Sequence, residues 1–88
     1  MRFSIISEIP GRTRLQLAGP VPESDLDALL KLSGEIDGVY KVRVYGRIGQ
    51  MALEYDEPHR DAVLAAVGAL DAQAIADAKT GYVMQLEP

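Results

Sequence analysis

Side chains that could do chemistry are few and widely spaced in this sequence. His59 is the single histidine, and no cysteine is present. A transition-metal site needs several histidine, thiolate or carboxylate ligands in a fixed arrangement. We therefore expect His59 to be a solvated residue in the first turn of a helix. We expect no metal and no cofactor to be bound.

Carboxylates are numerous, but their positions suit helix capping better than catalysis. Asp25 and Asp27 fall at one expected helix start, and Glu54, Asp56 and Glu57 surround another. Paired acids catalyse only when both face one cleft at a defined separation. No serine has an activating base in a recognisable pattern. We predict no catalytic residue and no enzyme activity for this chain.

One basic pair keeps a possible binding role. Arg12 and Arg14 alternate with Thr13, Leu15 and Leu17, so both arginines point to one face of a strand. They can form a solvated sheet face that pairs weakly with acids on neighbouring strands. They can instead bind an anion or a protein, because guanidinium forks suit carboxylates and phosphates. The spacing by itself favours the first interpretation.

Composition limits the partners. The chain has 88 residues, of which 48% are apolar and 25% charged, which predicts a single domain spanning residues 1–88. Its net charge of −4 repels phosphate, and no aromatic residues interleave with the basic ones, so we expect no nucleic-acid partner. No apolar run approaches the length of a membrane helix or a signal peptide. We expect a soluble, cytoplasmic domain.

Hydrophobic periodicity predicts an alternating series of strands and helices. The expected elements are one strand over 2–17 bent at Pro10–Gly11, a helix over 24–36 capped by Ser24, a β-hairpin of 39–45 and 51–55, a helix over 58–70, and a last strand over 82–86 that contains Met84. Residues 71–80 are Ala-rich without a clear period and stay open between helix, loop and strand. The order βαββαβ predicts an α+β, ferredoxin-like sandwich, with a four-stranded antiparallel sheet and two helices on one face. Met51 is then a core residue of the hairpin.

The strings IPGRTRLQL and DGVYKVRVYGRIGQMALEYD, with a helix between them, resemble a known family. They are similar to the divergent heavy-metal-associated domains at the N-termini of metal-transporting P-type ATPases. The likeness covers residues 3–86 and is weakest over 71–80. Residues that match the family pattern are Pro10, Gly11, Arg12, Arg14, Leu15, Gly38, Val39, Val42, Val44, Leu53, Tyr55, Asp56, Gly81 and Tyr82.

The chain departs from this family at the metal-binding loop. Metal-carrying members hold a G-M-x-C-x-x-C sequence there, whose two thiolates bind Cu(I) or Zn(II). Aligned on Gly19, the places of the two cysteines are taken by Pro22 and Asp25. The resemblance therefore implies that the soft-metal site has been lost. Glu23 and Asp25 could touch a harder ion, but two exposed acids are too few for strong binding.

The resemblance implies a role within a transport protein. The expected function is an N-terminal cytoplasmic regulatory or docking domain of a cation-transporting P-type ATPase, with the other domains of that transporter as partners. Its possible interaction surface comprises Arg12, Arg14, Glu23 and Asp25. Two alternatives remain: a free-standing binding module that forms a homodimer or senses a small ligand, and a small metallochaperone. The sequence leaves open which ion a parent pump would move.

Overall fold

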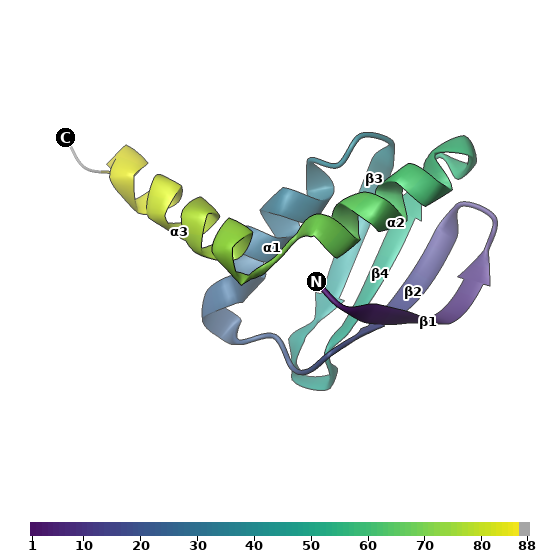
Figure 1. Cartoon of the computed structure of the whole chain (residues 1–88), viewed down its shortest axis with the longest axis horizontal. Helices are drawn as coiled ribbons and strands as arrows, with labels where there is room; N and C mark the ends of the chain where they lie inside the picture. Colours follow the sequence, from purple (N-terminus) through teal and green to yellow (C-terminus); the bar gives the residue numbers. More distant parts are fainter. Residues whose placement is uncertain (87–88) are drawn as a thin grey trace.

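A computed structural model describes the backbone of residues 1–86 and the side chains of residues 1–79. Two strands come first, followed by a helix, two further strands and two helices (Figure 1). The elements are β1 (Phe3–Ile9), β2 (Arg12–Leu17), α1 (Glu23–Gly34), β3 (Val39–Tyr45), β4 (Gln50–Tyr55), α2 (Arg60–Ala69) and α3 (Ala72–Leu86). One-turn 3-10 helices lie at Gly46–Ile48 and Glu57–His59.

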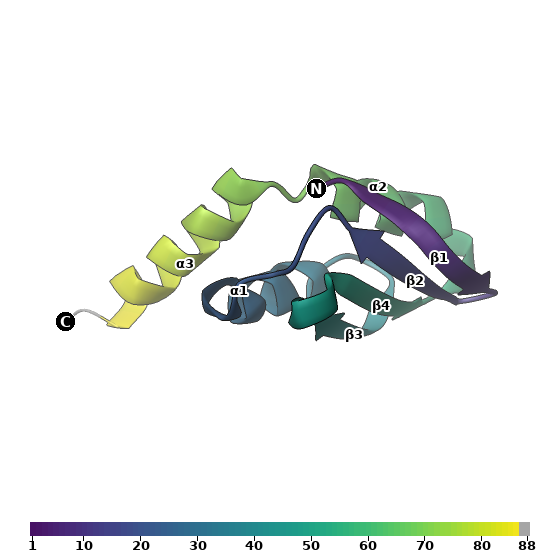
Figure 2. The ribbon, with the colours of Figure 1, turned by 90° about the horizontal axis from the view of Figure 1, so that it is seen from below.

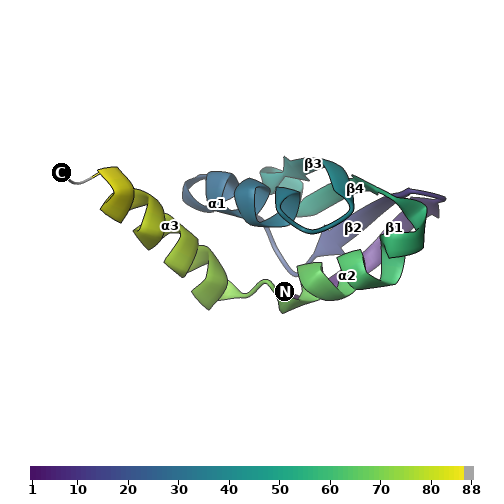
Figure 3. The same ribbon diagram turned by 90° about the horizontal axis from the view of Figure 1, so that it is seen from above.

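The strands form one antiparallel sheet in the order β1-β2-β4-β3. Strands β2 and β3 are joined by α1 and run parallel with β4 between them, which is a split βαβ arrangement. Helices α1 and α2 cover the same face of the sheet, in front of it in Figure 3 and behind it in Figure 2. The predicted α+β class, with a four-stranded antiparallel sheet and helices packed on it, is confirmed.

The prediction of one bent strand over residues 2–17 is wrong, because the chain reverses completely at Pro10–Gly11. Strands β1 and β2 form a hairpin in which Ile9 pairs with Arg12. A type II turn requires a positive φ at its third residue and often has proline at its second; Gly11 follows Pro10 and has a φ of 78°. A bulge between Ile5 and Ser7 shifts the register of this hairpin.

The last strand predicted over 82–86 is also wrong, since α3 runs to Leu86. The place at the sheet edge beside β2, where a βαββαβ chain puts its last strand, is filled by β1. The amino group of Met1 donates to the carbonyl of Gly68 at 2.6 Å, so β1 begins beside the end of α2. The strand arrangement of a ferredoxin-like sheet is therefore kept, while the connection order is permuted to ββαββαα.

Residues 71–80, for which the sequence left helix, loop and strand open, lie at the start of helix α3. Helix α2 ends at Ala69, and Leu70 after it has an extended backbone. The side chain of Asp71 then accepts a hydrogen bond from the amide of Ala74 at 2.8 Å. An Asp that accepts from the third helical amide is an N-cap, and the alanines that follow have high helix propensity. The predicted cap at Ser24 is wrong, because α1 already begins at Glu23 with Pro22 before it.

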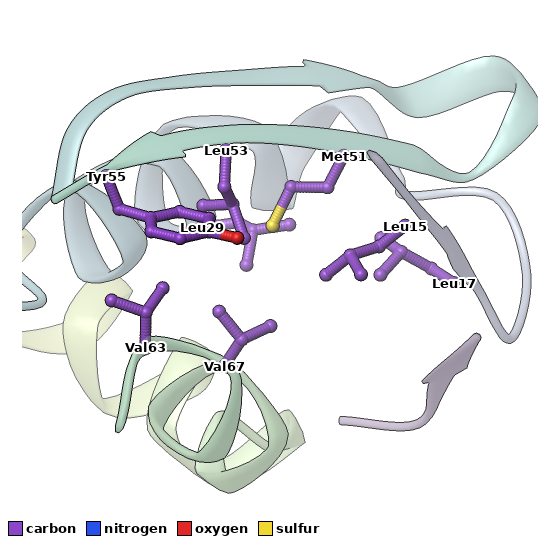
Figure 4. Packing of buried hydrophobic residues seen from close by; sticks show 8 residues of the cluster. All are labelled: Leu15, Leu17, Leu29, Met51, Leu53, Tyr55, Val63 and Val67. Atoms are coloured by element: carbon purple, nitrogen blue, oxygen red, sulfur yellow. The ribbon is translucent and has the colours of Figure 1, made fainter. Parts of the chain in front are cut away.

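Buried side chains from residues 1–79 form a cluster between the sheet and the two helices (Figure 4). Met51 is fully buried in it, as predicted. Strands β2 and β4, helix α1 and helix α2 all contribute to the cluster, with Leu15, Leu17, Leu29, Met51, Leu53, Tyr55, Val63 and Val67.

No helix within residues 1–86 is both long and apolar enough to cross a membrane.

Candidate functional site

The face of the sheet opposite α1 and α2 is free of helices and turns toward the viewer in Figure 2. Side chains alternate along each strand, so the register of the sheet fixes which residues share this open face. They form three rows across β1, β2, β4 and β3. The rows are Ile9–Arg12–Glu54–Lys41, Ser7–Arg14–Ala52–Arg43 and Ser4–Gln16–Gln50–Tyr45.

The open face concentrates positive charge on an acidic protein. Four of the nine lysines and arginines are in these rows, against one carboxylate, Glu54. Among the described side chains, no carboxylate lies within 4.0 Å of any of these four cations. Glu54 is the cross-strand neighbour of Arg12 and Lys41 and offsets part of their charge. The middle row carries two arginines and no acid.

The middle row has a small residue at its centre. Ala52 lies between Arg14 on β2 and Arg43 on β3, and it is only 8% exposed. The guanidinium carbon of Arg14 lies 5.2 Å from the ring centroid of Tyr45, a cation–π contact that directs Arg14 across β4 toward β3. A hollow of about 470 Å³ opens beside Arg14 on this face. The residues that line it include Ile6, Arg12, Arg14 and Ala52.

The structure separates the four residues proposed as an interaction surface into two pairs. Arg12 and Arg14 belong to the open face, whereas Glu23 and Asp25 belong to the first turn of α1. The carboxylate of Asp25 accepts a hydrogen bond from Lys79 of α3 at 2.8 Å. Asp25 also lines an apolar groove of about 360 Å³ between α1, the start of α3 and the loop that precedes α1.

A chain of polar contacts runs from the core to the surface at the other end of the sheet. The hydroxyls of Thr13 and Tyr55 lie 2.5 Å apart in the core, and Thr13 also donates to the carboxylate of Glu8 at 3.2 Å. Arg60 donates to Glu8 with both Nε and Nη2, the latter at 3.1 Å, and to Asp61 at 2.8 Å. The hydrogen bond from Arg60 is the main cause that lowers the pKa of Glu8, and the same contact raises the pKa of Arg60.

His59 ends the 3-10 turn that precedes α2, one residue before the first turn of the helix in which it was predicted. Its side chain is 44% exposed, as expected for a solvated residue, but its Nδ1 is buried and lies 3.4 Å from a carboxylate oxygen of Asp56. Gly38 leaves room for the imidazole, because a Cβ on this glycine would lie 2.9 Å from the Cβ of His59. Within the described part of the chain, no three His, Asp or Glu side chains are grouped as a metal site would need.

Sequence reasoning did not identify the open face as one surface. Lys41, Arg43 and Tyr45 alternate visibly with the apolar residues of their strand, in the same way as Arg12 and Arg14. That alternation assigns each set to one side of its own strand. Only the strand order places β4 between them, with Ala52 at the centre.

Compared with family models, curated protein sequences and solved structures, the chain gives no match.

Proposed function

We propose that this domain is a non-catalytic docking module that binds its partner through the open face of the sheet. The observation that carries the proposal is the middle row, in which Arg14 and Arg43 flank the small Ala52 and have no acid in register. Opposite charges that face each other across strands stabilise a sheet, whereas like charges do not. Here the cations outnumber the acids four to one.

The resemblance to heavy-metal-associated domains supplies the setting of the proposal. In that setting the domain is an N-terminal, cytoplasmic part of a metal-transporting P-type ATPase, and its partner is another domain of the same pump. The cysteines that would carry metal in such a domain are absent. Regulation of the pump by contact between domains is the role that remains, and ATP hydrolysis belongs to the rest of the transporter.

The coding sequence that follows codon 88 tests the transporter setting. We expect it to encode hydrophobic helices and then an aspartyl-phosphate motif. A stop codon directly after Pro88 would overturn this setting, because the domain would then have no pump to regulate.

Charge reversal tests the docking face itself. The remainder of the same polypeptide is expressed separately, and its affinity for the 88-residue domain is measured by calorimetry. Arg14→Glu with Arg43→Glu should weaken binding by about tenfold or more, because attractive charge pairs become repulsive. The matched control is Lys31→Glu with Arg47→Glu, which changes the net charge equally on α1 and beside the loop that precedes it. Equal losses in the two double variants would contradict docking by the open face.

A second candidate function, self-association, has one observation in its favour. The edge strand β1 exposes Ile5, Ile6 and Ile9 by 43%, 46% and 59%. The one charged residue of β1, Glu8, is paired with Arg60, so this edge offers little charge to oppose pairing with another chain. The opposite edge, β3, carries Lys41 and Arg43. Sedimentation equilibrium distinguishes the candidates. A stable dimer that Ile6→Lys dissolves would favour pairing through β1, and a monomer at all concentrations would exclude it.

A further inference from the structure

We infer that the partner of the open face is a short acidic segment of a protein, bound through its carboxylates by Arg14 and Arg43. This inference rests on the proposed docking function and names the chemistry that the docking face recognises. The two arginines occupy the same cross-strand row, one strand apart on either side of β4. Neighbouring strands are about 4.8 Å apart, so the two backbones are roughly 10 Å apart.

Ala52 is small enough for Arg14 to cross β4 above it, since its side chain is a single methyl group and is only 8% exposed. The guanidinium of Arg14 therefore lies beside Tyr45, two residues along β3 from Arg43 and on the same face, so that one anion can contact both arginines. Planar guanidinium forks bind carboxylates with two parallel hydrogen bonds. The row therefore matches an acidic side chain in both charge and shape.

Arg14 is held in place before any partner arrives. Its guanidinium packs on the ring of Tyr45, with 5.2 Å between the guanidinium carbon and the ring centroid. A side chain that is already ordered loses less conformational entropy on binding than a free arginine does. Tyr45 is thus a positioning residue, which acts on the partner only through Arg14.

The charge balance of the whole chain favours a short acidic segment over a polyanion. The net charge of −4 repels an extended phosphate backbone at long range. Arg14 lies over one face of the Tyr45 ring, which leaves less of that ring on which a nucleic-acid base could stack. A few carboxylates that meet the middle row at short range gain its local attraction without a large repulsion elsewhere.

A peptide titration of the isolated domain tests the inference. The probe is hexaglutamate blocked at both ends, and hexaglutamine is the neutral control. Binding of each peptide is monitored by the backbone amide chemical shifts of the domain. We expect hexaglutamate to shift the amides around Arg14, Arg43 and Ala52 and hexaglutamine to leave them unchanged. Binding should weaken as salt rises from about 0.01 M to about 0.1 M, where the Debye length falls from about 30 Å to about 10 Å.

Variants locate the binding on the row. Arg14→Gln with Arg43→Gln should weaken hexaglutamate binding by about tenfold, and Lys31→Gln with Arg47→Gln should change it by less than about twofold. Tyr45→Leu should weaken binding by about twofold to fivefold through loss of the cation–π contact. This loss should disappear when Arg14 is already Gln, a coupling that a purely structural role of Tyr45 would not produce. Circular dichroism confirms that each variant is folded.

Other anions and a second copy provide the contradicting outcomes. Tighter binding of a thymidine oligonucleotide, or of vesicles that contain phosphatidylserine, through the same amides would overturn a protein partner. Self-association that Arg14→Gln with Arg43→Gln abolishes would identify a second copy of the chain as the occupant instead. If the rest of the polypeptide binds through the row but hexaglutamate does not, the acidic-segment inference fails while the docking function stands. If hexaglutamate binds and the rest of the polypeptide does not, the docking partner is wrong and the acidic chemistry stands.

Discussion

At the residue scale, the hydroxyl of Thr13 is a buried polar group that joins side chains from different elements. It is fully buried, lies 2.5 Å from the hydroxyl of Tyr55 and donates to Glu8, which Arg60 also contacts. A buried hydroxyl needs a partner, because leaving it unpaired costs the full desolvation of the group. The four residues thereby tie β1, β2, β4 and α2 together.

Removal of the Tyr55 hydroxyl should measure how much its contact with Thr13 contributes to stability. We expect Tyr55→Phe to lower the free energy of unfolding by about 1 kcal/mol in urea denaturation. The double variant with Thr13→Val should cost less than the sum of the two single variants, because no unpaired hydroxyl then remains. Tyr40→Phe is the control, since Tyr40 is 72% exposed, and it should be neutral. Additive losses would show that the two hydroxyls do not depend on each other.

The contact of Glu8 with Arg60 should make a small, pH-dependent contribution to stability, because it is exposed to solvent. Its pKa is lowered from the ordinary value of 4.5, chiefly by the hydrogen bond from Arg60, so the ionised form is favoured in the fold. A group with a lowered pKa stabilises above its unfolded pKa and loses that contribution as the pH falls through its folded pKa. Glu8→Gln should therefore melt at a lower temperature than the wild type at pH 7.

The difference in melting temperature between wild type and Glu8→Gln should be constant above about pH 4.5 and should vanish below the lowered pKa. Circular dichroism melts across this range measure it. Glu35→Gln is the control, because Glu35 has no ion pair among the described residues. A difference for Glu8→Gln that persists unchanged at the lowest pH would show that the carboxylate charge is not its cause.

At the element scale, the tight turn between β1 and β2 decides the connection order of the sheet. Gly11 has a φ of 78°, and a Cβ there would lie 3.2 Å from the carbonyl oxygen of Tyr55. Its own carbonyl accepts a hydrogen bond from the amide of Tyr55 at 3.0 Å. The turn is thus fixed by conformation and by contact with the end of β4.

Two glycine-to-alanine variants should have opposite effects. Gly11→Ala forces an alanine into the left-handed region and should cost roughly 1–2 kcal/mol. Gly34→Ala should be neutral or stabilise by up to about 1 kcal/mol. Gly34 lies in α1 without a positive φ, and no atom lies within 4 Å of the position that an added Cβ would take. Urea denaturation of both variants measures the contrast. Equal effects at the two glycines would contradict the conformational explanation.

At the scale of the whole molecule, α3 is an addition to the sheet and its two covering helices. It extends away from the sheet in Figure 1, and none of the described side chains over residues 72–79 is buried. Its described contact with the rest of the chain includes the ion pair between Lys79 and Asp25. The core cluster and the apolar side chains packed on it end at Leu70.

A chain that ends after Asp71 should therefore still fold. We expect a single cooperative transition in urea and a loss of stability below about 2 kcal/mol, since an exposed ion pair contributes at most about 1 kcal/mol. Lys79→Gln in the full chain isolates the share of the ion pair. Loss of cooperative unfolding in the shortened chain would show that α3 belongs to the core.

The sequence by itself determined the layers of this domain. Period-two alternation identified the strand over 39–45 and its partner over 51–55, and the apolar stripe of α1 required a sheet to pack against. These signals are local, because each depends only on which side chains alternate along one element. They also placed Arg12 and Arg14 on the side of their strand opposite the core.

Tertiary structure decided what depends on neighbours distant in the chain. Alternation continues on both sides of Pro10–Gly11 whether the strand bends or reverses, so only pairing of β1 with β2 distinguishes the two. Once β1 fills the edge beside β2, residues 82–86 have no place in the sheet there, and the Ala-rich segment before them continues as helix. The middle row of Arg14, Ala52 and Arg43 likewise exists only because β4 lies between β2 and β3. Strand order is a non-local property, and for that reason one strand's pattern could assign the charges to a face without showing which charges share it.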